Sequence, residues 1–141
     1  MENEQVLTKL IDKILSTCKN EFKILEKFID DIPEFQLPTY SQLINPEFFL
    51  ETNTSYTQIS VTNHYHKVKI SKIMIDLSSM INEISKYKLN SVLQKGMNDL
   101  KTSKEKCIAY TNTLEEYQKS INQVLQHLQT FSYTVTQKFY E

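Results

Sequence analysis

Glycine is nearly absent from this chain, because Gly96 is the only one in 141 residues, and tryptophan does not occur at all. Tight turns normally depend on glycine, since it adopts positive φ without strain. Proline, the other common turn residue, occurs only at Pro33, Pro38 and Pro46. A fold with many short connections is therefore disfavoured, and we predict an all-α fold built from a few long helices.

Arginine is also absent, so all 16 basic residues are lysines. The planar guanidinium fork is the group best suited to phosphates and base edges. Residues 1–51 hold ten acidic residues and five lysines, and residues 52–141 hold eleven lysines and seven acidic residues. The small lysine excess in residues 52–141 is spread over the whole segment, whereas a nucleic-acid interface has clustered basic residues. We therefore expect no nucleic-acid partner.

Long apolar runs are missing as well, and none approaches the roughly 18 residues that a transmembrane helix needs. The first residues, Met1 to Glu4, are acidic, whereas a targeting signal would begin with basic residues. Cys18 and Cys107 fall at apolar positions of helical patterns, so we expect two buried free thiols. We expect a cytoplasmic protein without a transmembrane segment, attached to membranes at most peripherally.

The N-terminal segment, residues 1–32, has the spacing of an amphipathic helix. Its apolar residues recur every three or four positions with one gap at Glu21, and lysines occupy the other faces. The helix should stop before Pro33, which lacks an amide hydrogen. The apolar positions are Leu7, Ile11, Ile14, Cys18, Leu25, Phe28 and Ile32.

Residues 33–54 contain all three prolines and are predicted to form an irregular connector. The segment also carries large apolar residues, among them Leu43, Phe48 and Phe49, which a disordered segment would leave in water. We therefore expect part of it to pack against a helix of this chain or of a partner. Thr54 or Ser55 is predicted to cap the helix that follows.

Residues 55–141 carry two rows of apolar residues at heptad spacing, the pattern of a coiled coil. The first row, here called the upstream seam, consists of Ile70, Ile73, Leu77, Met80, Ile84 and Tyr87. The second row, here called the C-terminal seam, consists of Leu93, Leu100, Cys107, Tyr110, Leu114, Tyr117, Ile121, Val124, Leu128, Phe131 and Val135.

The two seams are out of register. Continuing from Ile84 places the next heptad position at Ser91, but the apolar residue is Leu93, and Gly96 follows closely. Either one helix of about 80 residues changes its packing near residues 88–96, or the chain turns there and forms a hairpin. No Asn-Gly pair or similar tight-turn signature is present, so we favour the continuous helix.

A long apolar row on a helix is unfavourable in water, so it has to pack against other parts of this chain or against partner chains. We expect the first helix and the connector to be too small to cover all of it, which implies an elongated coiled-coil subunit with partner chains. On this basis Leu114→Asp or Ile121→Asp should abolish assembly, because a charge in a dry seam is strongly unfavourable.

No constellation of catalytic or metal-binding residues stands out. His64 and His66 point to different faces of a helix, and we expect both of them, and His127, to lie at the surface. The adjacent acidic pairs Asp30–Asp31 and Glu115–Glu116 also point in different directions, so neither makes an acid–base pair. We therefore expect no enzyme activity, no metal and no cofactor.

Two blocks of residues resemble a known family. The first block is Thr54-Ser55-Tyr56, Ile59 and Asn63, and the second is Asn112 to Glu116, Ile121, Gln123, Leu128 to Ser132, Val135 and Lys138-Phe139. They are similar to subunit 2 of the biogenesis of lysosome-related organelles complex 1, whose last helix carries a Leu-acidic-x-Tyr-Ser-x-x-Leu-Glu-x-Lys-Tyr run. Phe131 and Phe139 stand where that family has tyrosines, and Gln129 and Thr136 stand where it has acidic residues.

The resemblance implies a helical subunit of a hetero-oligomeric complex that acts in endosomal sorting and in the biogenesis of lysosome-related organelles. It implies other helical subunits as partners and a peripheral place on endosomal or lysosomal membranes, and it brings no catalytic or ligand residues. Two alternatives stay open here. One is a subunit of another coiled-coil assembly, such as a kinetochore, tethering or transcription-coactivator complex, and the other is a small helical enzyme or ligand-binding bundle.

Overall fold

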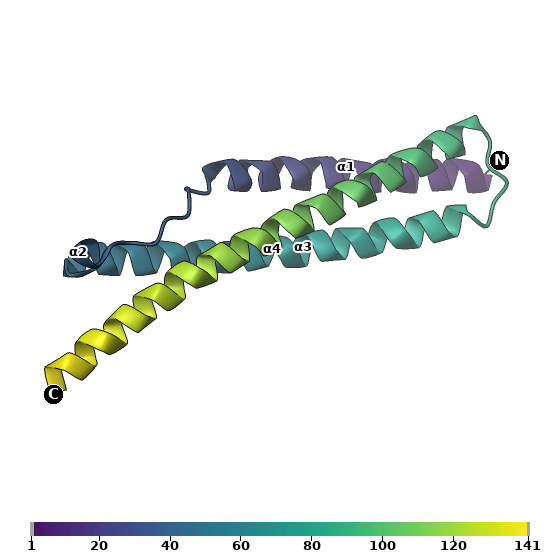
Figure 1. Ribbon diagram of the computed structural model, residues 1–141. Helices are drawn as coiled ribbons and strands as arrows, with labels where there is room; N and C mark the ends of the chain where they lie inside the picture. The colour runs from purple at the N-terminus through teal and green to yellow at the C-terminus, as the bar shows by residue number, and fades with distance from the viewer. Residues whose placement is uncertain (1, 141) are drawn as a thin grey trace. The chain divides into compact units, whose positions relative to one another are not determined.

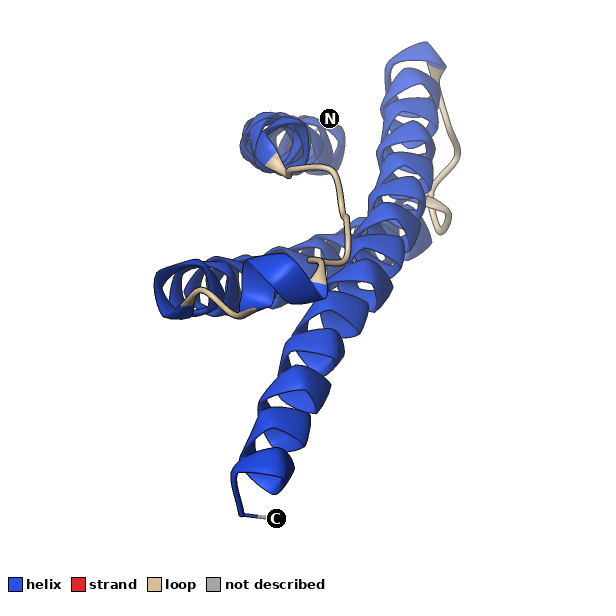
Figure 2. Cartoon of the chain, turned by 60° about the vertical axis from the view of Figure 1, so that its left-hand side comes forward, coloured by secondary structure: helices blue, strands red, loops and turns tan. Residues whose placement is uncertain are grey.

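The computed structural model describes residues 2–140, and most of them are helical (Figures 1 and 2). Within these residues the helices are α1 (Glu2–Asp31), α2 (Tyr40–Leu43), α3 (Pro46–Ile84) and α4 (Ser91–Tyr140), and there is no strand. The predicted all-α class is confirmed, together with its N-terminal helix, proline-containing connector and long C-terminal helix.

The chain divides into two compact units, which are described separately. The first, called the α1 unit, consists of α1, the part of α3 from His66 onward and the part of α4 up to Asn112. The second, called the connector unit, consists of Ile32–Tyr65 and the part of α4 from Thr113 onward.

Helix α1 buries the face that its spacing predicts, including Leu7, Ile11, Cys18 and Leu25. Phe22 is buried as well and continues the row at the point where the pattern lapses, next to Glu21. The last helical residue is Asp31, because Pro33 cannot donate a backbone hydrogen bond and restricts the residue before it.

The connector is shorter than the predicted range of 33–54, because α3 begins at Pro46. Proline is favoured in the first turn of a helix, where no amide hydrogen is needed. Asn45 caps this end, since its side-chain oxygen accepts hydrogen bonds from the amides of Glu47 at 3.0 Å and Phe48 at 3.4 Å. The predicted cap at Thr54 or Ser55 is wrong, and both residues lie inside α3.

A one-turn helix, α2, interrupts the connector. The Gln42 amide donates to the Thr39 hydroxyl at 3.2 Å, and the Thr39 amide donates to the Gln42 side chain at 2.9 Å, which together form a capping box. This turn places Leu43 in a core cluster with Val124 and Leu128 of α4. The prediction that part of the connector packs against a helix of this chain is therefore confirmed.

The continuous helix favoured from the sequence is wrong, and the alternative with a break is correct. Helix α3 ends at Ile84, and α4 starts at Ser91 after a short loop (Figure 1). The start of α4 is fixed by Asn90, whose side-chain oxygen accepts a hydrogen bond from the Leu93 amide at 2.9 Å. The loop of residues 85–90 ends the register of α3 and the Asn90 cap begins that of α4, which accounts for the offset between the two seams.

Gly96 lies in the second turn of α4, not in the turn of the chain, and its role is close packing. A Cβ atom at this position would lie 3.0 Å from Cδ1 of Ile11 in α1. Few real Cβ contacts are so short, so the missing side chain lets the two helices of the α1 unit approach each other closely.

Candidate functional site

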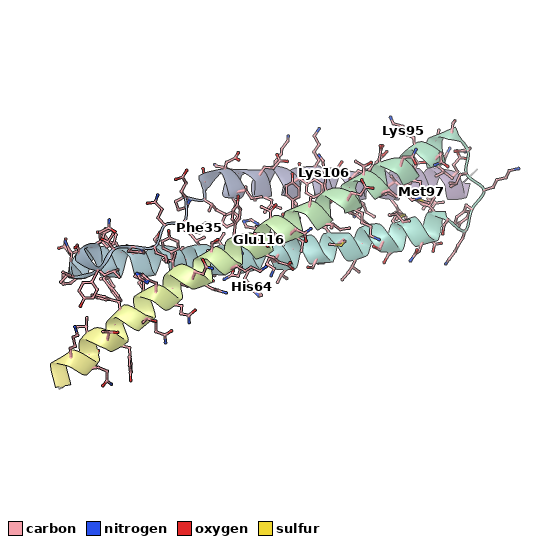
Figure 3. The ribbon with its side chains drawn as sticks, viewed as in Figure 1. Phe35, His64, Lys95, Met97, Lys106 and Glu116 are labelled. Atoms are coloured by element: carbon pink, nitrogen blue, oxygen red, sulfur yellow. The ribbon has the colours of Figure 1, made fainter. Side chains whose placement is uncertain are left out.

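The C-terminal seam is mainly a core row of this chain. Tyr110, Tyr117 and Phe131 are half-buried, and Val135 is exposed. The other seam residues are all buried, namely Leu93, Leu100, Cys107, Leu114, Ile121, Val124 and Leu128. Met97, which the heptad pattern did not include, is buried beside them (Figure 3).

The upstream seam is also covered within the chain. Ile70, Ile73, Leu77 and Ile84 are buried, and Met80 is half-buried. Tyr87 falls in the loop after α3 and is exposed, so it belongs to no seam. Most of both rows is therefore buried within the chain, and the part of the C-terminal seam at Phe131 and Val135 is not fully covered. The buried part of the seams is not free to bind a partner, so we looked for exposed apolar residues on other faces.

A different face of α3 remains apolar and exposed. Val61, Tyr65, Val68 and Ile75 are each more than half exposed. Val61 and Tyr65, four residues apart in the connector unit, lie on one side of α3, and Val68 and Ile75, seven residues apart in the α1 unit, lie on one side of its other part. Successive side chains of a helix are rotated by about 100° around its axis. Val68 and the buried Ile70 are therefore about 200° apart and point in nearly opposite directions. We call Val61, Tyr65, Val68 and Ile75 the outer α3 face.

The outer α3 face could have been found in the sequence, because its spacing is that of an amphipathic helix. It was missed because the heptads from Ile70 to Ile84 assign α3 only one apolar side. His64, between Val61 and Val68, is exposed (Figure 3), Lys67 in the same stretch is half-buried, and the exposed Lys72 lies between Val68 and Ile75. Exposed apolar residues that follow one side of a helix are typical of a protein-interaction surface.

A buried polar cluster lies in the connector unit, centred on Asn63 of α3. The Asn63 side-chain amide donates to the backbone carbonyl of Leu114 and to the side-chain oxygen of Gln118, each at 3.0 Å. Gln118 in turn donates to the hydroxyl of Ser60 at 3.0 Å and to the side-chain oxygen of Asn122 at 2.9 Å. A buried asparagine of this kind fixes the register between two helices, because any shift leaves its amide without partners.

His66 is a core residue of the α1 unit, which corrects the expectation that it lies at the surface. It is buried, and its ring centroid lies 4.6 Å from that of Phe28. An ion pair between Lys69 and Glu21, with Nζ and Oε1 3.3 Å apart, joins α3 to α1 in the same unit. Burial, and after it the charge of Lys69, lowers the pKa of His66, while Glu21 acts in the opposite direction.

His127 is likewise not a simple surface residue. It is half-buried in the connector unit, and its Nε2 atom lies 2.9 Å from the carbonyl oxygen of Pro38. This distance suits an imidazole N–H that donates to the carbonyl and ties the connector to α4. Only His64 is exposed as expected.

The lowered pKa of His66 predicts a loss of stability in mild acid. Above the ordinary pKa of 6.5, histidine is neutral in both the folded and the unfolded chain. As the pH falls through that value, the unfolded chain takes up a proton before the folded chain does, so the free energy of unfolding decreases. Urea unfolding followed by circular dichroism should show a lower midpoint at acidic than at neutral pH. His66→Phe should weaken this dependence, and His64→Phe, the control, should preserve it.

The two cysteines are buried free thiols of the α1 unit, as predicted. Burial raises the pKa of Cys107 to about 12, and the proximity of Cys18 adds to this effect. The pKa of Cys18 is raised as well, first by burial and then by Asp76. Thiols with such pKa values are protonated at neutral pH, so this geometry suits packing and not nucleophilic chemistry.

Tyr110 links α4 to α1 at the edge of the same core. Its ring centroid lies 5.2 Å from that of Phe22, and its hydroxyl donates a hydrogen bond to the carboxylate of Glu26. Lys106 lies over the other aromatic ring, with Nζ 5.9 Å from the Phe22 centroid (Figure 3). Burial, followed by the hydrogen bond to Glu26, raises the pKa of Tyr110 to about 12.

Among residues 2–140, no group of three or more His, Cys, Asp or Glu side chains is arranged to hold a metal ion. None of the helices in this range combines the length and the apolar character that crossing a bilayer requires. No family model, no curated protein and no solved structure matches the chain. The feature of this molecule that most resembles a functional site is the outer α3 face.

Proposed function

We propose that this protein is a non-catalytic helical subunit of a multi-protein complex, and that the outer α3 face binds a helix of a neighbouring subunit. The observation that carries the proposal is the row of Val61, Tyr65, Val68 and Ile75, exposed on the side of α3 opposite its core. Exposed apolar residues at helical spacing are energetically unfavourable in water and are the anchors that helix–helix interfaces use.

We further propose that the complex acts in endosomal and lysosomal trafficking and in the biogenesis of lysosome-related organelles. This step rests on the resemblance of two blocks, 54–63 and 112–139, to subunit 2 of the biogenesis of lysosome-related organelles complex 1. In this proposal the protein is cytoplasmic and reaches endosomal or lysosomal membranes peripherally, through its partner subunits.

The proposal predicts that Val61→Asp combined with Val68→Asp separates the protein from its complex. Two carboxylates on the outer α3 face cannot be buried without a large desolvation cost, so recovery of partner subunits should fall at least about tenfold. Both positions are exposed, so the helical circular-dichroism signal should remain. The measurement is affinity purification of the tagged full chain from its own cells, followed by quantitative mass spectrometry.

Val92→Asp is the matched control, because Val92 is an exposed valine in the first turn of another helix, α4. It should leave partner recovery unchanged. Equal recovery with the double variant and the original chain would contradict the role of the outer α3 face. Recovery of kinetochore, tethering or coactivator subunits without endosomal ones would replace the trafficking assignment by another coiled-coil assembly.

A further inference from the structure

Within the α1 unit, α1 and the first part of α4 run in the same direction at a nearly constant register. Each of four contacts pairs a residue of α1 with one that follows it by 84 to 88 positions. Helices that run side by side in parallel keep such an offset, so other facing pairs should have a similar one. The four contacts are Glu4 with Asn90, Ile11 with Gly96, Phe22 with Tyr110 and Glu26 with Tyr110.

The two cysteines fit this register. Cys107 follows Cys18 by 89 positions, next to the range of the other pairs. Cys18 lies one turn before Phe22, and Cys107 lies one turn before Tyr110, and these two rings are in contact. Both thiols are buried, and Cys18 is near enough to act on the pKa of Cys107. The two side chains therefore face each other across the packed surfaces of α1 and α4.

Helix geometry brings such facing residues within the range of a disulfide. The Cα atoms of a helix lie about 2.3 Å from its axis, and the axes of packed helices are about 8–10 Å apart. Cα atoms that face each other directly are then roughly 3.4–5.4 Å apart, and disulfides span Cα separations of about 4.4–6.8 Å. A bond between Cys18 and Cys107 therefore requires little movement of either helix.

Cys18 is the thiol nearer to solvent. It lines an open groove of about 430 Å³ between α1 and α4 and a smaller one between α1 and α3, and Cys107 lines neither of these two. Both thiols are protonated at neutral pH in the closed unit, so they react with an oxidant only when the helices separate locally. We therefore assign the first reaction with an oxidant to Cys18.

We propose that Cys18 and Cys107 form a reversible disulfide that fixes α1 to α4 when the surrounding thiol pool becomes oxidised. In the locally open form, the Cys18 thiolate attacks one sulfur of oxidised glutathione. The S–S bond of glutathione breaks, and one glutathione leaves as a thiolate and takes up a proton. As the helices close, the Cys107 thiolate attacks the Cys18 sulfur, and the second glutathione leaves in the same way.

The net reaction converts two protein thiols and one glutathione disulfide into one protein disulfide and two glutathione thiols. In a reducing thiol pool the pair stays reduced, and a more oxidising pool forms the bond, as in disulfides that sense redox conditions. The bond joins residues 89 positions apart, and cross-links over long stretches restrict the unfolded chain most. Oxidation should therefore stabilise the α1 unit. This inference does not depend on the proposed function.

The disulfide is measured in the full-length protein, equilibrated with reduced and oxidised glutathione at graded ratios. Acid and an alkylating reagent trap the free thiols, and mass spectrometry of the digested chain identifies the linked peptides that contain Cys18 and Cys107. The equilibrium constant for this bond should be at least about a hundredfold larger in the native chain than in concentrated urea. Equal constants, or disulfides that only join two chains, would overturn the proposal.

Oxidation should also raise the midpoint of urea unfolding by at least about 1 M, measured by circular dichroism with and without a reducing agent. This comparison needs no substitution, because the same chain is measured in both states. Cys18→Ala and Cys107→Ala should each remove the difference between the two states. A midpoint that oxidation of the original chain leaves unchanged or lowers would contradict the stabilising role of the bond.

Cys107→Ala combined with Ile108→Cys is the matched control for the register. It keeps two thiols in the chain but moves one by about 100° around α4, to an exposed position. In the glutathione buffers this variant should form mixed disulfides at position 108 and no bond between that position and Cys18. If it forms the internal bond as readily as the original chain, the two native thiols are not held face to face and the proposal fails.

Discussion

Leu114→Asp should unfold the connector unit, and it is the substitution for which we expect the largest effect. Leu114 is fully buried in α4. Removing a buried leucine side chain alone costs about 2–5 kcal/mol. A carboxylate in the same place adds a large desolvation cost. The sum approaches the whole stability of a typical domain, which is about 5–15 kcal/mol.

Circular dichroism and urea unfolding of the purified chain measure this effect. Gln129→Asp, an exposed change on the same helix, is the control and should unfold at nearly the midpoint of the original chain. The sequence pattern alone led us to expect loss of assembly from Leu114→Asp. The structure places the side chain inside this chain's own core, so loss of folding should come first. A stable, helical Leu114→Asp protein would contradict that placement.

Asn63→Asp should destabilise the protein by about 2–4 kcal/mol, which is the second-largest effect we expect. The Asn63 amide donates to two oxygen atoms, the Leu114 carbonyl and the Gln118 side chain. A carboxylate in the same position would face both oxygens without a proton to donate. Burial and these acceptors should raise the folded-state pKa of the new aspartate above its unfolded value. The lost stability should therefore return in part as the pH falls.

Asn63→Leu is the informative comparison for the same site. It removes the two donated hydrogen bonds, but it also removes the Asn63 side-chain oxygen, which is buried without a hydrogen-bond partner in the described structure. Its cost should therefore be well below that of Asn63→Asp in urea unfolding at neutral pH. If both variants lose the same free energy of unfolding, then the lost amide donors of Asn63, and not the added charge, account for the destabilisation by Asn63→Asp.

The helical fold and much of its core could be predicted from the sequence, because apolar spacing reports directly on which side of a helix is buried. The rows containing Leu25, Leu77 and Leu114 were all identified in this way. The same spacing cannot tell whether the covering surface comes from the same chain or from another one. The sequence therefore led us to expect partner chains over rows that this chain buries in large part by itself.

The features that could not be predicted depend on local capping and on polar groups in the core. The break before α4 is set by the hydrogen bond between Asn90 and Leu93, and a single asparagine is a weak signal in a sequence rich in asparagine. Asn63 and His66 occupy heptad positions, but polar side chains are normally assigned to the surface. Phe22 continues the α1 row one position after Glu21, where the spacing lapses. Both positions lie close to the buried side of the helix, so the pattern did not point to Phe22.

The buried thiols give the protein an internal reporter of its own motion. A reagent that modifies only thiolates can reach Cys18 and Cys107 when α1 separates from α4, and both residues regain ordinary reactivity in that open form. The rate of modification under native conditions therefore measures how often the α1 unit opens. No dye or tag has to be introduced. A partner that makes this opening rarer should lower the rate of modification of Cys18 and Cys107 without contacting either residue.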